Sequence, residues 1–269
     1  MRTMRRAVAV FAALLALSVA AGNGRAAAAE PAATPRSAPV GPALKVLAYD
    51  TRPFFYRDGD KPAGLEYEIL EYYARAKGRP LQVVWVDDFA QVIGRLARGE
   101  GDVAAATLTA TPERSQQVDF SARYFPVRVM LVEPRDQHTA SLADLAGATV
   151  ATIKGTTYET VMSQVPRAKF LYGVTEDDML KLIAAGKARA AAADSALVLG
   201  PLRNYPQLHL GIPLSPEQGL AFAVPKGSPL GDELSRHIAQ LKAGQIYYRL
   251  LEKHLGAEAA KLAAAGRQQ

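Results

Sequence analysis

The sequence predicts an α/β protein built as two lobes around a cleft, each lobe holding a parallel or mixed sheet. Between residues 44 and 107, apolar strand patterns alternate with helical patterns in the order β-α-β-α-β, which is typical of a parallel sheet. The same alternation starts again after an apolar strand at 127–133. Two amphipathic helical patterns remain at the end of this tandem, at 232–244 and 246–256.

The elements follow from hydrophobic periodicity and from glycine stops. Apolar side chains recur at helical spacing in the segment 64–78: Leu65, Ile69, Leu70, Tyr73 and Ala76. Segment 102–107 is apolar throughout, like strands that are buried on both faces. By the same criteria we expect strands at 44–50, 81–86, 102–107, 127–133, 149–153, 169–173, 188–193 and 219–228. We expect the earlier helices at 64–78, 89–99, 141–147, 157–165, 176–187 and 196–206.

The first 42 residues do not belong to the predicted fold. A basic MRTMRR segment precedes the apolar run AVAVFAALLALSVAA, and AAAAE offers a cleavage site, so residues 1–29 are expected to be a secretory signal peptide. An uncleaved membrane anchor is the alternative, although the run is short against the roughly 20 residues of a spanning helix. We expect a disordered linker at 30–42, a tail at 257–269 and a periplasmic location for the folded part.

Composition and charge exclude several classes of function. The net charge of +6 falls to +2 without residues 1–29, which hold four basic residues and no acidic residue. No basic run with interleaved aromatic residues is present, so nucleic acid is not an expected partner. The chain has no cysteine, which excludes disulfides, thiol chemistry and a lipid-modified cysteine. The four histidines lack metal-ligand spacing, and we expect no cofactor.

An arginine in an unusual place singles out the stretch TLTATPERSQQVDFS, residues 107–121. Thr111 can cap a short helix, Pro112 suits its first position and Glu113 suits its positive end. Arg114 opposes the helix dipole in the same turn, at a cost of up to about 1 kcal/mol. A bound anion would remove this conflict, because a guanidinium pairs bidentately with a carboxylate.

Segments spread over residues 44–256 resemble the periplasmic solute-binding proteins of the polar amino acid type, family 3. They are KVLAYDTRPFFY, KPAGLEYEIL, TPERSQQVDFS, IKGTTYET, AAADSALVL, AFAVPKGSPL and LKAGQIYYRLLEKHLG. The resemblance implies a monomer with the bilobed type II periplasmic-binding-protein fold, which closes on an amino acid or related zwitterion and delivers it to an ABC transporter permease. We expect lobe 1 at 43–130 and 220–256, lobe 2 at 131–219, and two crossing strands near Val129–Glu133 and Gly219–Val224.

The resemblance also implies the two main ligand contacts. Arg114 would bind the α-carboxylate of the ligand, and Asp194 would bind its α-ammonium from the other lobe. Asp194 follows an apolar strand, and ligands of α/β sheets bind beyond the carboxyl ends of strands. A zwitterion that bridges both residues would favour the closed form. The alternatives are a surface arginine on an exposed helix and an aspartate that caps one.

Threonines accompany both charges. Thr107 and Thr109 alternate along the expected strand end and would share one face, where the family binds the ligand through hydroxyl groups. Thr157, in GTTYET, matches the family's carboxylate contact from lobe 2, beside the capping-box spacing of Thr156 and Glu159. Ordinary β-branched packing and helix capping are the alternatives.

Aromatic residues are expected to wall the ligand side chain. Phe89 matches the family's aromatic wall, with a place in the core as the alternative. Phe54 belongs to a cluster with Phe55 and Tyr56 near the other wall, and the sequence does not give the direction in which this cluster faces. Thr51 stands where relatives often carry an aromatic residue. Ala48 stands where lysine- or arginine-binding relatives often carry an acid, which weakly disfavours a cationic ligand.

Two further functions stay open. GLEYEIL, ADSALVLGPLRNYPQL and LEKHLG are also similar to the sensing domain of membrane-bound lytic murein transglycosylases, which suggests a module that binds cell-wall peptide fragments and controls a partner. Cyclohexadienyl dehydratases are enzymes on the same fold. The chain has no second carboxylate beside Asp194, no G-x-S-x-G elbow and no P-loop, so we expect a binding protein rather than an enzyme.

Overall fold

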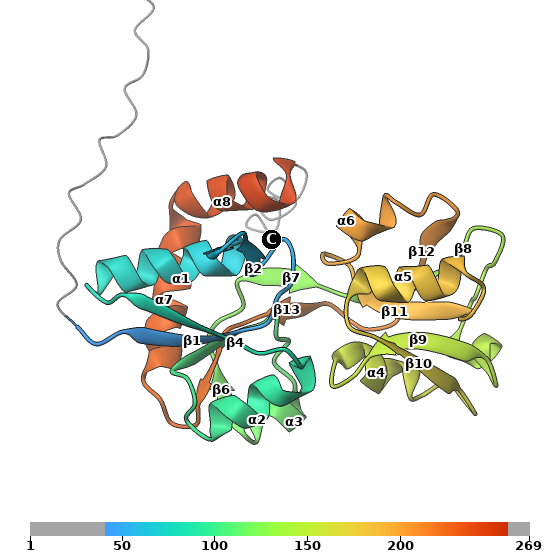
Figure 1. The fold of residues 1–269 in the computed structure, drawn as a ribbon, viewed down its shortest axis with the longest axis horizontal. Helices are drawn as coiled ribbons and strands as arrows, with labels where there is room; N and C mark the ends of the chain where they lie inside the picture. Colours follow the sequence, from blue (N-terminus) through green and yellow to red (C-terminus); the bar gives the residue numbers. More distant parts are fainter. Residues whose placement is uncertain (1–40, 258–269) are drawn as a thin grey trace, which may run out of the picture. The chain divides into compact units, whose positions relative to one another are not determined.

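The structure, a computed structural model, describes residues 41–257. The expected signal peptide, nearly all of the expected linker and all but the first residue of the expected tail lie outside these residues. Two five-stranded sheets, each flanked by helices, form the framework (Figure 1). This arrangement confirms the predicted mixed α/β fold with two sheets. Between residues 41 and 257 no helix is long and apolar enough to cross a membrane.

Sheet 1 has the strand order β4-β1-β5-β14-β6. Its strands are β1 (Leu44–Ala48), β4 (Leu81–Trp85), β5 (Val103–Ala105), β6 (Val118–Phe120) and β14 (Ala223–Pro225). β1 pairs in parallel with β4 and β5, as the alternation of strands and helices predicts, whereas β14 pairs antiparallel with β5 and β6. The helices around this sheet are α1 (Leu65–Ala76), η1 (Phe89–Gln91), α2 (Val92–Ala97), α3 (Pro112–Ser115), α7 (Leu230–Ala243) and α8 (Ile246–Leu255).

Sheet 2 has the strand order β10-β9-β11-β8-β12. Its strands are β8 (Val129–Pro134), β9 (Thr149–Ile153), β10 (Lys169–Gly173), β11 (Ala190–Asp194) and β12 (Leu208–Pro213). β9 pairs in parallel with β10 and β11, and β8 pairs antiparallel with β11 and β12. Its helices are η2 (Leu142–Leu145), α4 (Thr157–Met162), α5 (Glu176–Ala184) and α6 (Leu199–Leu202).

A two-stranded antiparallel ribbon joins the two sheets (Figure 1). It consists of β7 (Phe125–Val127) and β13 (Gln218–Leu220). The first crossing strand therefore precedes the expected Val129–Glu133, whereas the second overlaps the expected Gly219–Val224. The strand expected at 127–133 is divided at Arg128, and β8, with Val129, pairs inside sheet 2 rather than crossing between the sheets. The strand expected at 219–228 is likewise two strands, β13 and β14. Arg128 alone separates β7 from β8, and the apolar Ala221 and Phe222 separate β13 from β14, so the pairing partners rather than the hydrophobic pattern reveal the breaks.

Some elements differ from the sequence expectation. The sequence did not predict a hairpin formed by β2 (Tyr56–Asp58) and β3 (Lys61–Ala63). It also did not predict the strands β6 and β12. The helix expected at 196–206 shrinks to α6, because the backbone N–H groups of Leu197 and Val198 donate to the carbonyl of Asp194 and form a turn instead. A turn at this place keeps the Asp194 side chain at the end of β11.

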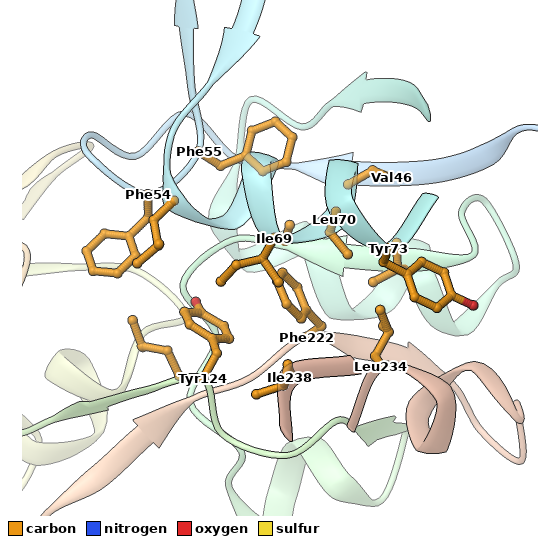
Figure 2. Packing of buried hydrophobic residues seen from close by; sticks show 14 of the residues in the cluster. Val46, Phe54, Phe55, Ile69, Leu70, Tyr73, Tyr124, Phe222, Leu234 and Ile238 are labelled. Atoms are coloured by element: carbon orange, nitrogen blue, oxygen red, sulfur yellow. The ribbon is translucent and has the colours of Figure 1, made fainter. Parts of the chain in front are cut away.

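Each sheet carries its own hydrophobic core. Figure 2 shows Ile69, Leu70 and Tyr73 of α1 packed with Phe222 and Leu234 over sheet 1. The predicted apolar face of α1 is buried except at Ala76, which is exposed. Full burial of one such side chain contributes about 1.5–3 kcal/mol. The two clusters share no residue, although Leu197, which follows β11 of sheet 2, belongs to the core over sheet 1. The ribbon between the sheets can therefore bend while most of each core stays packed.

Gly64 permits α1 to begin directly against the loop at Phe54. Its φ is 116°, and a Cβ added there would lie 2.2 Å from the Phe54 carbonyl oxygen. The same oxygen accepts a hydrogen bond from the Glu66 N–H at 2.8 Å. A side chain at Gly64 would therefore push α1 off the loop that precedes it.

We expect Gly64→Ala to lower the free energy of unfolding by about 2–5 kcal/mol, because a backbone clash adds to the strain of a positive φ. Gly59→Ala is the matched control, since Gly59 has φ 59° and no atom within 4 Å of an added Cβ. The control should cost only about 1–2 kcal/mol. Urea unfolding of both variants measures the difference, and equal losses would contradict the close approach.

Candidate ligand-binding site

A pocket lies where the parallel strands of both sheets end. Its lining residues stand at or beyond the carboxyl ends of β1, β4 and β5 in sheet 1 and of β9, β10 and β11 in sheet 2. They are Tyr49, Asp50, Thr51, Phe89, Thr107, Thr109, Arg114, Ile153, Thr156, Thr157, Tyr158, Val174, Thr175, Glu176, Asp194 and Leu197. Ligands of α/β sheets bind at such carboxyl ends. The topology thus brings six segments that are distant in sequence to one place.

Arg114 supplies the pocket's positive charge. Thr111 caps the single turn of α3 by accepting the Arg114 N–H, as the sequence predicts. The guanidinium donates from Nη1 to the Thr109 carbonyl at 2.8 Å and from Nη2 to the Gly155 carbonyl at 3.0 Å. Burial lowers the pKa of Arg114 to about 10. Both hydrogen-bond acceptors are neutral carbonyls, so a carboxylate would be a much stronger partner for this cation.

Asp194 supplies a buried carboxyl from sheet 2. It ends β11 with 4% of its surface exposed, and its Oδ1 accepts the Ala196 N–H at 2.8 Å. The pKa of Asp194 is raised to about 7. Burial and the charge of Glu176 raise it, while the hydrogen bonds from the N–H groups of Ala196 and Leu197 lower it. The capping alternative is therefore partly right: Asp194 holds a turn, although no helix begins at Ser195.

All three threonines named from sequence line the pocket, but one of the reasons given for them is wrong. β5 ends at Ala105, and Thr107 has a φ of 51°, so Thr107 and Thr109 do not alternate along a strand. Thr109 instead bridges to Leu220 of the ribbon. Thr157 begins α4, whose cap is Thr156; the Glu159 carboxylate accepts the N–H of Gly155 rather than that of Thr156.

Phe89 lines the pocket, whereas Phe54 does not. Phe54 is fully buried in the core over sheet 1, edge-on to Phe125 with ring centroids 5.9 Å apart. The loop at β1 turns its aromatic cluster inward, so Phe54 packs below the site rather than at it. Tyr49 takes the wall position instead, edge-on to Phe89 at 5.5 Å.

Glu176 is the residue that the sequence analysis missed. It stands at the start of α5, after β10, and its Oε1 accepts the Tyr158 hydroxyl at 3.2 Å. Burial raises the pKa of its carboxyl. No second carboxylate is adjacent to Asp194 in the chain, yet the fold places Glu176 in the same pocket. Its only signal in the sequence is the acidic helix start TEDD, which is also what a solvated helix end looks like.

Two hydrogen bonds and one close backbone contact connect the two sides of the pocket. The Arg114 guanidinium reaches the Gly155 carbonyl, and the Tyr49 hydroxyl donates to the Val174 carbonyl at 2.7 Å. Gly155 also lies close to Ala90, because a Cβ added at Gly155 would be 2.9 Å from the Ala90 Cα and Cβ. These contacts connect loops of sheet 1 with loops of sheet 2, so they can form only while the two sides are together.

A buried glutamate holds the Thr107 loop. Glu66 in the first turn of α1 is 0% exposed and accepts the Thr107 N–H, at 3.1 Å and 3.3 Å from its two oxygens. The Tyr124 hydroxyl donates to the same carboxyl at 2.7 Å. Burial raises the pKa of Glu66 to about 7, and these two bonds lower it. Glu66 thus fixes the left-handed backbone of Thr107 from below the pocket.

The arrangement suits a small zwitterion. A guanidinium stands on one side, carboxyls stand on the other, and hydroxyl groups lie between them. Charge-assisted hydrogen bonds to both ends of an α-amino acid would compensate charges that burial now leaves unpaired. Between residues 41 and 257, no three His, Asp or Glu side chains gather where they could hold a metal ion.

The family described as bacterial extracellular solute-binding proteins, family 3, matches residues 44–257. The arginine-binding extracellular protein ArtP of Bacillus subtilis is 29% identical over 213 residues, which are 76% of this chain and 82% of ArtP. The crystal structure of the substrate-binding protein of an amino acid ABC transporter superposes with a TM-score of 0.72 at 26% identity, covering 80% of this chain and 99% of that one.

A second group of relatives is longer. The membrane-bound lytic murein transglycosylase F of Desulfosudis oleivorans is 29% identical over 219 residues, which are 78% of this chain. The aligned part is 48% of that protein, so the chain spans about half the length of this relative. The similarity to murein transglycosylases stated from sequence is therefore confirmed for the matched part.

We expect Glu66→Gln to gain stability relative to the unchanged chain as pH rises from about 4.5 to about 7. Glu66 has its pKa raised from 4.5 to about 7, so the folded protein binds this proton more tightly than the unfolded chain does. As pH rises from about 4.5 to about 7, Glu66 ionises in the unfolded chain before it ionises in the folded protein, so the unchanged protein loses stability. Glutamine does not ionise and causes no such loss. The relative gain should be on the order of 2–3 kcal/mol.

Urea unfolding of both proteins at pH 5 and at pH 8 measures this gain. The comparison cancels the other titrating groups, which both proteins share. A gap between the two proteins that stays constant across this range would contradict the buried ionisation of Glu66.

Proposed function

Because the chain belongs to the bacterial extracellular solute-binding proteins of family 3, we propose that it binds a small α-amino acid in the pocket and delivers it to an ABC importer. The observation that carries the proposal is the partly buried Arg114 guanidinium, held by two backbone carbonyls and 5.5 Å from the Phe89 ring centroid, in the same pocket as the buried Asp194 carboxyl. Arg114 would take the α-carboxylate and Asp194 the α-ammonium. Thr107, Thr109 and Thr157 would supply hydroxyl contacts, and Phe89 an apolar wall.

Binding would hold the two sides of the pocket together. A zwitterion that contacts Arg114 and Asp194 is bound by loops of both sheets, so it stabilises the closed arrangement over any open one. The ribbon of β7 and β13 is the part that would bend, because it joins two separately packed cores. The closed monomer, exported by the expected signal peptide, would present its surface to a membrane permease outside the cytoplasm.

A sensing role is the second candidate. The observation that favours it is the similarity to transglycosylase F over 78% of this chain. In this role the same pocket would bind a cell-wall peptide fragment and the closed form would regulate a separate partner. Binding of muropeptides, together with failure of every free amino acid to bind, would favour this role over transport.

An enzymatic role has one feature in its favour. The carboxyls of Asp194 and Glu176 share the pocket, and burial raises the pKa of each, as in sites that use a carboxylic acid as proton donor. The ancestral amino acid-binding protein described as a precursor of cyclohexadienyl dehydratase superposes with a TM-score of 0.71 at 25% identity. We still favour binding, which needs no reactive group beyond the charges described.

We expect Arg114→Lys to weaken the binding of an α-amino acid by about 10-fold to 100-fold, because lysine cannot form the bidentate pair. Calorimetry on refolded protein, free of carried-over ligand, measures the loss across the common amino acids. Arg98→Lys is the matched control, since Arg98 is exposed and pairs with Glu100 away from the pocket. Equal affinity of the Arg114 variant and the control for the amino acid would contradict the proposal.

We expect Gly155→Ala to weaken binding by keeping the two sides of the pocket apart. An added Cβ would lie 2.9 Å from Ala90 across the pocket, in addition to the strain of φ 75°. Gly147→Ala isolates the strain, because Gly147 has φ 74° and no atom within 4 Å. Small-angle X-ray scattering with and without the amino acid should show a smaller compaction for the Gly155 variant only. Full compaction in that variant would rule out closure through this contact.

A further inference from the structure

The charges of the pocket do not balance for a neutral zwitterion. Three carboxylates line it, from Asp50, Glu176 and Asp194, against the single guanidinium of Arg114. The two charged ends of an α-amino acid would pair with Arg114 and Asp194 and leave both other carboxylates without a cation. Within residues 41–257, none of these three acids forms an ion pair with a side chain of the protein.

Of the two remaining carboxylates, those of Asp50 and Glu176, the negative charge of Glu176 is the one that requires a cation. Its carboxyl accepts a hydrogen bond from the neutral Tyr158 hydroxyl at 3.2 Å, and burial raises the pKa of this carboxyl. The acids after it on α5 behave differently: Asp177 lies 2.7 Å and Asp178 3.7 Å from the Lys181 ammonium. Asp50 is exposed and accepts the Arg57 N–H, so water can screen its charge. Glu176 is therefore the partly buried carboxylate of this pair, and in the described part of the chain it lies at the pocket without an ion-pair partner.

Thr51 provides an independent sign of a missing polar partner. It lines the pocket with 7% of its surface exposed, and its Oγ1 is buried without a hydrogen-bond partner in the described part of the chain. A buried hydroxyl that lacks a partner costs about 1–3 kcal/mol in stability. A ligand that brings additional N–H donors into this pocket would satisfy that oxygen.

The walls fit a chain of methylene groups. Apolar side chains line the pocket between its charged ends: Tyr49, Phe89, Ile153, Val174 and Leu197. Tyr49 and Phe89 meet edge-on and offer the largest apolar surface. A flexible aliphatic stem would be buried against such side chains while its polar tip reaches a charged partner.

We infer that the ligand is an α-amino acid whose side chain ends in a cation, an amine or a guanidine, and that Glu176 binds this cation. The inference rests on the proposed function, because it assigns the α-carboxylate to Arg114 and the α-ammonium to Asp194. Ala48 had weakly disfavoured a cationic ligand, but the fold brings an acid to the pocket from α5 instead. A side chain that ends in a carboxylate is excluded by the same charge.

Calorimetry with two pairs of nearly isosteric probes tests the inference on the refolded chain. L-ornithine is compared with L-norleucine, and L-arginine with L-citrulline, so that each pair differs mainly in charge. In at least one pair the cationic member should bind about 10-fold or more tightly than its neutral partner. This comparison uses the unaltered protein and does not depend on how any variant folds.

Glu176→Gln should then reduce this preference to about 3-fold or less, because the cationic member loses its charged partner. Asp177→Asn is the matched control, because it removes the same charge from the same helix turn outside the pocket. The control should keep the preference.

The outcomes separate the inference from the function. Neutral members that bind as tightly as cationic members, or a preference that survives Glu176→Gln, would overturn the inference and leave amino acid binding intact. Failure of every α-amino acid to bind would overturn both. Loss of the preference in the Glu176 variant alone supports the inference.

Discussion

The partly buried guanidinium of Arg114 is the constraint on which the site depends. It is held at the junction of the two sides by a carbonyl from each, Thr109 on one and Gly155 on the other. Neither carbonyl carries a charge, so the fold stabilises the position of the cation without neutralising it. A buried charge that is positioned but unpaired is poorly stable by itself and is best stabilised by an anion. The site therefore attracts an anion because the protein supplies no anionic partner for Arg114 within the described residues.

The supporting structure keeps that cation in place. Glu66, which lies below the pocket, fixes the left-handed Thr107, and the chain continues from there through Thr109 to the cap of α3. The carboxyl of Glu66 is itself buried and held by Tyr124. Polar groups under the pocket thus form a connected network, in which each bond restrains the loop that carries the next contact.

The two sides of the pocket differ in charge. Sheet 1 contributes the Arg114 cation and the exposed Asp50, while sheet 2 contributes Asp194 and Glu176, both with raised pKa values because of burial. Attraction between the sides is limited while the acids hold their protons. A ligand with positive charge favours the ionised carboxyls, so binding and closure act on the same groups. The ribbon of β7 and β13 permits this movement because each sheet has a separate core.

The sequence by itself determined the α/β class, the tandem of two units and the cap at Thr111, since these depend on local periodicity and on capping chemistry. Through short motifs it also singled out Arg114 and Asp194 as candidate ligand contacts. It did not determine how the crossing strands divide, because a single residue, Arg128, separates β7 from β8, and Ala221 and Phe222, which separate β13 from β14, are as apolar as their neighbours. Tertiary structure alone decided that Phe54 is core, that Tyr49 forms the wall and that Glu176 joins Asp194 in one pocket. Those facts depend on which strand ends lie next to each other in the fold. Glu176 and Asp194 are 18 positions apart, and no local sequence pattern shows that they meet.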